Sequence, residues 1–314
     1  MTVVFFGTPE FAVPSLRHLL DSRHVVAAVV SQPDRPRGRG QKLQPTATKA
    51  LALARDVRVL QPERIRGEPF LEAIAALQPD LGVVAAYGKI LPDALLQIPR
   101  LGMINVHASL LPAWRGAAPV HRAVIAGATE TGVTIMRVVQ ELDAGPMMAV
   151  ARRPVGPDET SVEVERALAE LGAPLLLNVV EDLAAGRATE TPQDHSRATY
   201  APKITKTEGA IDWRRPAAEI HNLVRGLQPW PLVTAWIDGA RYLIHRTSLT
   251  GRPTSAPGGT IVEAAGGHLA VAAGDGHLLE ILEIQPEGRR AMSAREFLSG
   301  HAIHPGATIT SPPT

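Results

Sequence analysis

The chain has 314 residues, 45% of them hydrophobic, and a formal net charge of +1 at pH 7. That length accommodates two domains, or one large domain with additions, and the apolar content is enough for a folded core. The absence of cysteine excludes disulfide bonds, thiolate metal ligands and a cysteine nucleophile. The near-neutral charge excludes a uniformly basic surface, so any contact with nucleic acid must come from a local patch.

The sequence opens on an apolar run with no basic region before it, so we expect no signal peptide. We find no apolar stretch that approaches the length of a membrane span. Together with the lack of cysteine, these features favour a cytoplasmic protein.

The first half of the chain alternates short apolar runs with amphipathic segments. The apolar runs predict strands at residues 3–6, 24–31, 81–86, 103–107 and 133–139. The amphipathic segments predict helices at residues 13–20, 49–55, 70–77 and 119–126, and one or two helices over 161–183. Strands separated by helices indicate βαβ units, so the sequence predicts an α/β fold with a doubly wound, mainly parallel sheet.

The turn after the first strand reads Gly7, Thr8, Pro9 and Glu10. A single glycine there does not make the G-x-G-x-x-G pattern of dinucleotide-binding proteins, and no P-loop pattern occurs either. We therefore expect a tight strand-to-helix turn without a phosphate cradle.

Residues 31–49 form the most basic segment of the chain. Their cations are Arg35, Arg37, Arg39, Lys42 and Lys49, against a single acid, Asp34. Two glycines and three prolines in the same segment predict an exposed, mobile loop. Such a composition fits an ordinary charged loop, and it also fits a segment that binds phosphate backbones.

Asn105 and His107 lie two residues apart on the strand predicted around residues 102–107. Side chains at that spacing point to the same face of a strand. A carboxamide can hold a carbonyl oxygen, and an imidazole can donate or accept a proton near neutral pH. Asp143 could orient that imidazole. The alternative is a hydrogen-bonded polar pair at a strand end, with Asp143 an ordinary turn residue.

Two short segments near this pair could form an apolar slot for a flat ring. The first consists of Ser109, Leu110, Leu111 and Pro112, and the second follows the strand at 81–86 and contains Tyr87, Ile90 and Leu91. Plain core packing is an equally good interpretation of Ile90 and Leu91.

The character of the sequence changes over residues 182–205, where polar residues, glycine and proline predict a boundary. We expect a first domain at 1–188, a linker at 189–207 and a second domain at 208–314. Beyond a short helix at 219–225, strands are predicted at residues 233–237, 242–245, 260–263, 269–272 and 278–284. Short strands separated by turns predict a small antiparallel barrel. His301 and His304 have no third ligand nearby, so we expect no metal site.

The Asn–x–His pair, the S-L-L-P segment and the downstream aspartate together resemble the folate-dependent formyltransferases. Residues 105–118 (NVHASLLPAWRGAA) resemble more narrowly the branch of this family that acts on methionyl-tRNA. Further segments of the same resemblance are FGTPEF at 6–11, SQPDRPRGRG at 31–40, APKITK at 201–206, IDW at 211–213 and PWP at 229–231. The resemblance therefore covers nearly the whole chain.

The resemblance implies a Rossmann-like formyltransferase fold followed by an OB-like barrel. It implies transfer of the formyl group of 10-formyltetrahydrofolate to the α-amine of methionine on initiator tRNA, by a monomer without a metal. Asn105, His107 and Asp143 would be catalytic, and the apolar slot would take the pterin ring of the folate. The expected tRNA-binding residues are Arg35, Arg37, Arg39, Lys42, Lys203 and Lys206.

Other functions remain open on the sequence. The protein could formylate a sugar nucleotide or hydrolyse the formyl-folate. It could also be a non-catalytic RNA-binding protein, although the presence of all three polar residues argues against that.

Overall fold

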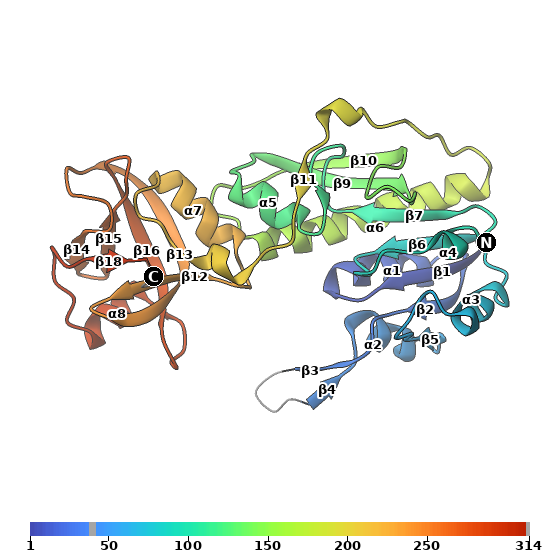
Figure 1. Ribbon diagram of the computed structural model, residues 1–314, viewed down its shortest axis with the longest axis horizontal. Coiled ribbons are helices and arrows are strands. Elements are labelled where there is room, and N and C mark those ends of the chain that lie inside the picture. The colour runs from blue at the N-terminus through green and yellow to red at the C-terminus, as the bar shows by residue number, and fades with distance from the viewer. Residues whose placement is uncertain (38–41, 312–314) are drawn as a thin grey trace. The chain divides into compact units, whose positions relative to one another are not determined.

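The computed structural model describes residues 1–37 and 42–311, and the chain forms two compact units (Figure 1). Unit 1 consists of residues 1–119, 131–153 and 165–201. Unit 2 consists of residues 120–130, 154–164 and 202–314. The linear domain boundaries suggested by the sequence, at residues 188 and 208, stay a prediction.

Unit 1 is built on a seven-stranded sheet with the strand order β10-β9-β7-β6-β1-β2-β5. The strands are β1 (Thr2–Gly7), β2 (Val25–Val30), β5 (Val59–Leu60), β6 (Leu81–Ala85), β7 (Met103–His107), β9 (Glu130–Arg137) and β10 (Met147–Pro154). The four adjacent pairs from β7 to β5 are parallel, whereas β7 and β9 are antiparallel. The predicted mainly parallel sheet is thus confirmed.

Helices cover both faces of this sheet. They are η1 (Glu10–Ala12), α1 (Val13–Leu20), α2 (Ala47–Ala54), α3 (Glu68–Ala75), α4 (Asp93–Leu96) and α6 (Ser161–Ala184). Helix α5 (Pro119–Ile125) belongs almost entirely to unit 2. Met103 of β7 packs in one core cluster with Phe70 of α3 and Leu95 of α4. Val106 points to the opposite face of β7, where it lies against Gly172 of α6. A Cβ at position 172 would come within 3.2 Å of Val106, so this glycine permits the close approach of α6.

Part of the basic segment forms strands in place of the loop that its composition predicted. Residues Arg35–Arg37 and Lys42–Gln44 form an antiparallel pair, β3 and β4, and α2 begins at Ala47. The side chain of Thr46 accepts a hydrogen bond from the backbone N–H of Lys49 and caps α2. The helix therefore starts two residues before the predicted position. Residues 35–37 and 42–44 form strands rather than the predicted loop because their backbones satisfy each other's hydrogen bonds.

Unit 2 contains a second seven-stranded sheet, with the order β14-β15-β16-β13-β12-β18 and β17 paired to β16. Its strands are β12 (Val233–Ile237), β13 (Ala240–Pro253), β14 (Ile261–Ala265), β15 (His268–Ala272), β16 (His277–Pro286), β17 (Met292–Ser293) and β18 (Ile309–Thr310). All of their pairs are antiparallel. The helices of this unit include α7 (Ala217–Gly226) and α8 (Ala294–Gly300).

The two ends of this second sheet approach one another. Thr260, just before β14, forms a bridge with Thr308, just before β18. The backbone N–H of Ile261 also donates to the carbonyl of Ala307 at 2.8 Å. These bonds curl the sheet toward closure, as the predicted small barrel requires. Over residues 1–37 and 42–311, the chain has no helix whose length and apolar content would let it cross a membrane.

Candidate functional site

The candidate site is at the carboxyl end of β7, where the strand carries Asn105 and His107. Both belong to the central part of the sheet, because β7 pairs with β6 on one side and β9 on the other. His107 is 5% exposed and Asn105 is half-buried. Open α/β sheets place their ligand sites at the carboxyl ends of strands. The predicted pair is therefore where such a site is expected.

The ring of His107 is held by the backbone of Trp114. Nε2 of His107 lies 3.0 Å from the carbonyl oxygen of Trp114. A carbonyl can only accept, so Nε2 carries the hydrogen of this bond. Trp114 has a φ of +63°, a left-handed conformation that aims its carbonyl at the ring. The nitrogen left to exchange a proton is Nδ1.

The structure brings Asp143 to that nitrogen. Its Oδ2 lies 3.7 Å from Nδ1 of His107, and its side chain is 15% exposed. This separation is longer than a hydrogen bond, so the two groups face one another with no direct bond. The same oxygen accepts a hydrogen bond from the backbone N–H of Gly116 at 2.8 Å. Gly116 belongs to β8 (Arg115–Gly116), which pairs with β11 (Tyr200–Ala201).

The segment that follows His107 is folded against β9 through Thr134. The hydroxyl of Thr134 donates to the carbonyl of Ser109 at 2.7 Å and accepts from the N–H of Leu111 at 3.2 Å. Ser109 is fully buried, and its own hydroxyl donates to the carbonyl of Ala113 at 2.6 Å. Leu111 is buried as well, which leaves Leu110 and Pro112 half-exposed as the apolar part of the segment. Sequence analysis missed Thr134, because a threonine inside a strand carries no distinguishing signal.

Tyr87 lies in the core. Its side chain is 2% exposed, and its ring meets that of Phe6 edge-on at a centroid distance of 5.6 Å. Burial raises the pKa of Tyr87 to about 12. A ligand beside this segment can therefore meet the backbone of Tyr87 but not its ring. The carbonyl of Tyr87 accepts a hydrogen bond from Nε2 of Gln32 at 3.2 Å.

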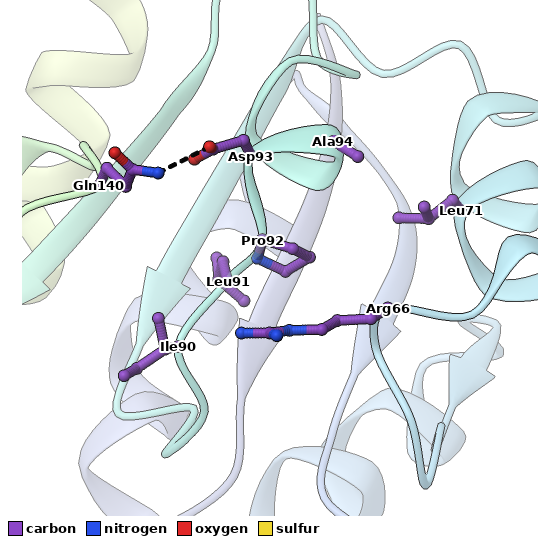
Figure 2. Close-up of a pocket in the computed structure, with 8 residues that line it drawn as sticks. All are labelled: Arg66, Leu71, Ile90, Leu91, Pro92, Asp93, Ala94 and Gln140. Atoms are coloured by element: carbon purple, nitrogen blue, oxygen red, sulfur yellow. Dashed lines mark hydrogen bonds between the residues drawn. The ribbon is translucent and has the colours of Figure 1, made fainter.

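Ile90 and Leu91 line a cavity of about 340 Å³ (Figure 2). The other lining residues are Arg66, Leu71, Pro92, Asp93, Ala94 and Gln140. Ile90 is 75% exposed, so core packing does not explain it, whereas Leu91 also packs against the core of unit 1. Nε2 of Gln140 donates to Asp93 at 2.8 Å, which ties α4 to the loop that carries Asp143. The walls are mostly aliphatic, with one guanidinium extending across the pocket (Figure 2).

The structure describes some of the cations of the basic segment at residues 31–49. Arg35 is exposed on β3, Arg37 and Lys42 are backbone partners in the hairpin, and Arg39 lies outside the described residues. Lys49 differs from them, because its Nζ donates to Asp34 at 2.6 Å and to Gln61 at 2.7 Å. Nε2 of Gln61 also donates to Asp34, at 2.7 Å, and the hydrogen bonds from Lys49 and Gln61 lower the pKa of the Asp34 carboxyl group. The ammonium group of Lys49 is therefore paired with the carboxylate of Asp34 within unit 1.

In unit 2, Lys203 and Lys206 lie on a segment whose backbone is anchored by Arg122. The guanidinium of Arg122 donates to the carbonyls of Pro202 at 3.0 Å and Lys203 at 3.2 Å, and it pairs with Glu208. Both lysine side chains are exposed. The carbonyls of Pro202 and Lys203 are therefore bonded to Arg122, while the two lysine side chains face solvent. In the described part of the chain, no cluster of His, Cys, Asp and Glu is arranged to hold a metal ion.

The chain belongs to the formyl transferase family. The family model described as formyl transferase matches residues 1–180, and the model of the formyl transferase C-terminal domain matches residues 203–302. The methionyl-tRNA formyltransferase of Methylococcus capsulatus is 47% identical over 96% of this chain and 98% of its own length. That of Pseudomonas putida GB-1 is 48% identical over 95% of this chain and 96% of its own.

Solved structures with a similar fold are much more distant in sequence. WlaRD, a sugar 3N-formyltransferase crystallised with dTDP and 5-N-formyl-THF, superposes with a TM-score of 0.68 at 15% identity, over 92% of this chain and 99% of its own. HypX of Aquifex aeolicus, solved with tetrahydrofolic acid, gives a TM-score of 0.62 at 16% identity, over 94% of this chain and 46% of its own. At these identities the likeness bears on the fold alone.

Proposed function

We propose that the protein transfers the formyl group of 10-formyltetrahydrofolate to the α-amine of methionine on initiator tRNA. The observation that carries the proposal is the apposition of His107 and Asp143 at 3.7 Å, beside Asn105 at the carboxyl end of β7. It gains support from relatives named methionyl-tRNA formyltransferase, which match this chain over nearly its full length.

In this reaction the amine nitrogen bonds to the formyl carbon, and the bond from that carbon to the folate nitrogen breaks. One proton leaves the amine, and one is gained by the folate nitrogen. The amine must be neutral to attack, and free α-amines titrate at about 7.7–8.0, so a useful neutral fraction exists near pH 7. The protein therefore has to position the reactants and stabilise negative charge on the formyl oxygen.

We assign those tasks to the three polar side chains. The carboxamide of Asn105 donates to the formyl oxygen. His107 donates to the same oxygen from Nδ1 when both ring nitrogens carry a hydrogen, since Nε2 already donates to the carbonyl of Trp114. Asp143 orients the imidazole and collects the amine proton, directly or through water. Its second oxygen, Oδ1, is left for this task, because Oδ2 accepts from Gly116.

For the folate we propose the apolar surface formed by two segments of unit 1. Leu110 and Pro112 would cover one side of the ring, and Ile90 and Leu91 the other. The cavity that Ile90 and Leu91 line has aliphatic walls suited to a flat ring, and the backbone from residue 87 onward can hydrogen-bond its edge.

For the tRNA we propose local basic groups, as the net charge of +1 requires. One set is Arg35, Arg37, Arg39 and Lys42 in the segment of β3 and β4, and the other is Lys203 and Lys206. Clustered lysine and arginine side chains bind phosphates. We further propose that the protein acts as a monomer in the cytoplasm, where charged tRNA is available.

The test follows a labelled formyl group from formyl-folate in the presence of methionyl-tRNA, an amino-sugar nucleotide, or water alone. We expect label on methionyl-tRNA. Label on the sugar nucleotide, or release as formate, would refute the proposed acceptor. For His107→Ala we expect a fall in kcat of about 10²–10³, as for loss of an oxyanion donor, with tRNA affinity unchanged. Near-normal turnover by this variant would remove His107 from the mechanism.

A further inference from the structure

We propose that Gln193 is a positioning residue for formyl transfer, acting through the backbone of Asp143. The inference rests on the proposed function. Gln193 lies in the segment that the sequence suggested was a linker, 50 residues after Asp143 along the chain. It is 5% exposed, and it faces the loop between β9 and β10.

The backbone of Asp143 is in an uncommon conformation. Its φ is +48°, in the left-handed region that residues with a Cβ seldom adopt, although aspartate enters it more readily than most. The side-chain N–H groups of Gln193 donate to the carbonyl of Asp143 at 2.8 Å and to that of Gly145 at 2.7 Å. The amide group of Gln193 is thus hydrogen-bonded to the backbone of the loop at two positions, Asp143 and Gly145.

The orientation of this amide is fixed by Arg115. Nε and Nη2 of Arg115 donate to Oε1 of Gln193 at 3.1 and 2.8 Å. With two donors on one side and two carbonyls on the other, only one of the two amide orientations satisfies every partner. Arg115 is 1% exposed, and its Nη1 also meets Glu141 at 3.3 Å. A charge buried to this degree is retained only where it is well paired.

Arg115 and the residue that follows it restrain Asp143 at two points, its backbone and its side chain. The next residue, Gly116, donates its N–H to Oδ2 of Asp143, while Arg115 acts on the backbone of Asp143 through Gln193. The position of the carboxylate relative to His107 is therefore set by Gly116 at the side chain and by Gln193 at the main chain. Loss of the second restraint should let the carboxylate drift while leaving the substrate-binding segments in place.

The experiment uses Gln193→Glu and Gln193→Met in the full-length protein. The glutamate keeps its partnership with Arg115 but turns a carboxylate oxygen toward two carbonyls, whereas methionine loses both sets of bonds. We expect kcat to fall by up to about 10²-fold in both variants, with the KM values for folate and methionyl-tRNA unchanged. A kcat equal to that of the wild type, or a loss confined to KM, would overturn the proposal.

A double-mutant cycle separates positioning from general damage. In an Asp143→Ala background, Gln193→Glu should change kcat by less than about threefold, because the group it positions is gone. An equal loss in both backgrounds would refute action through Asp143. The matched control is Gln285→Glu in unit 2, where the amide of Gln285 likewise donates to a backbone carbonyl, that of Arg289, at 2.8 Å. We expect its kcat to be unchanged.

A second readout needs no turnover. Amide hydrogen exchange in a peptide covering residues 142–146 should be faster in Gln193→Glu than in the wild type, with the strands of unit 1 unchanged. Unaltered exchange there would overturn the proposal even if the protein formylates nothing. A wild-type protein that delivers label to a different acceptor would refute only the proposed acceptor, since the cycle can be run with the acceptor found.

Discussion

Thr134→Val tests whether the segment after His107 is held in place by one buried hydroxyl. Thr134 is fully buried on β9, and the exchange replaces its hydroxyl with a methyl group of nearly the same size. The packing is preserved, but two hydrogen bonds are lost. They are the bond donated to the carbonyl of Ser109 and the bond accepted from the N–H of Leu111.

The magnitude follows from what the substitution leaves behind. Both bonds are buried, so the carbonyl of Ser109 and the N–H of Leu111 would each lose a partner away from water. A buried group without a partner costs about 1–3 kcal/mol, which gives about 2–6 kcal/mol for the pair before any relaxation. We expect the free energy of unfolding to fall by at least about 2 kcal/mol.

Thr131→Val on the same strand provides the matched control. Thr131 is 3% exposed, and its hydroxyl finds no hydrogen-bond partner among the described residues. Replacing an unpaired buried hydroxyl with a methyl group removes a desolvation cost, so this variant should be as stable as the wild type or more stable. Urea unfolding followed by circular dichroism measures both. Equal destabilisation of the two variants, or an unchanged Thr134→Val, would refute the reasoning.

Three further predictions use other parts of the chain. Gly145→Ala should abolish formyl transfer, because its Cβ would lie 2.0 Å from a backbone oxygen of β9, whereas Gly67→Ala, with nothing nearer than 3.9 Å, should be fully active in the same assay. Hydrogen bonds from Arg214 lower the pKa of Asp212 from 3.8 to about 2. The stability it contributes should therefore be complete above pH 4 and lost as the pH falls through about 2, and thermal unfolding of Asp212→Asn should lack that part of the acid dependence. Arg35→Ala should weaken tRNA binding and reduce the slope of log affinity against log salt by about 0.7–0.9, measured by filter binding, and an unchanged slope would exclude a phosphate contact.

Much of the fold was predictable because the central strands carry their own signal. Strands such as β2 and β6 are apolar along nearly their whole length, as strands covered on both faces must be. β10 was missed for the opposite reason. It is an edge strand without a fully buried side chain, so no hydrophobic period marks it. The sequence also predicted only residues 242–245 of β13, because its second half is mostly exposed and ends on Gly251, Arg252 and Pro253.

The candidate site also contains some residues that the sequence predicts and others whose positions it could not predict. Asn105 and His107 were predictable because two residues on one strand share a face whatever the rest of the chain does. The approach of Asp143 was not, since it depends on a turn between β9 and β10 and on Gly116, which lies 27 residues away along the chain. The burial of Tyr87 was equally out of reach, because the partner of its ring, Phe6, belongs to the first strand.

Local motifs therefore identify groups that can react, whereas the groups that hold them come from distant segments. Gln193 is separated from its partner Arg115 by 78 residues and lies in polar sequence with no apolar period. It nevertheless satisfies two carbonyls of the loop that presents Asp143. Substitution of Gln193 should therefore lower kcat rather than merely alter the connection between domains. By this reasoning Gln193 belongs to the site, although the sequence around it predicts a linker.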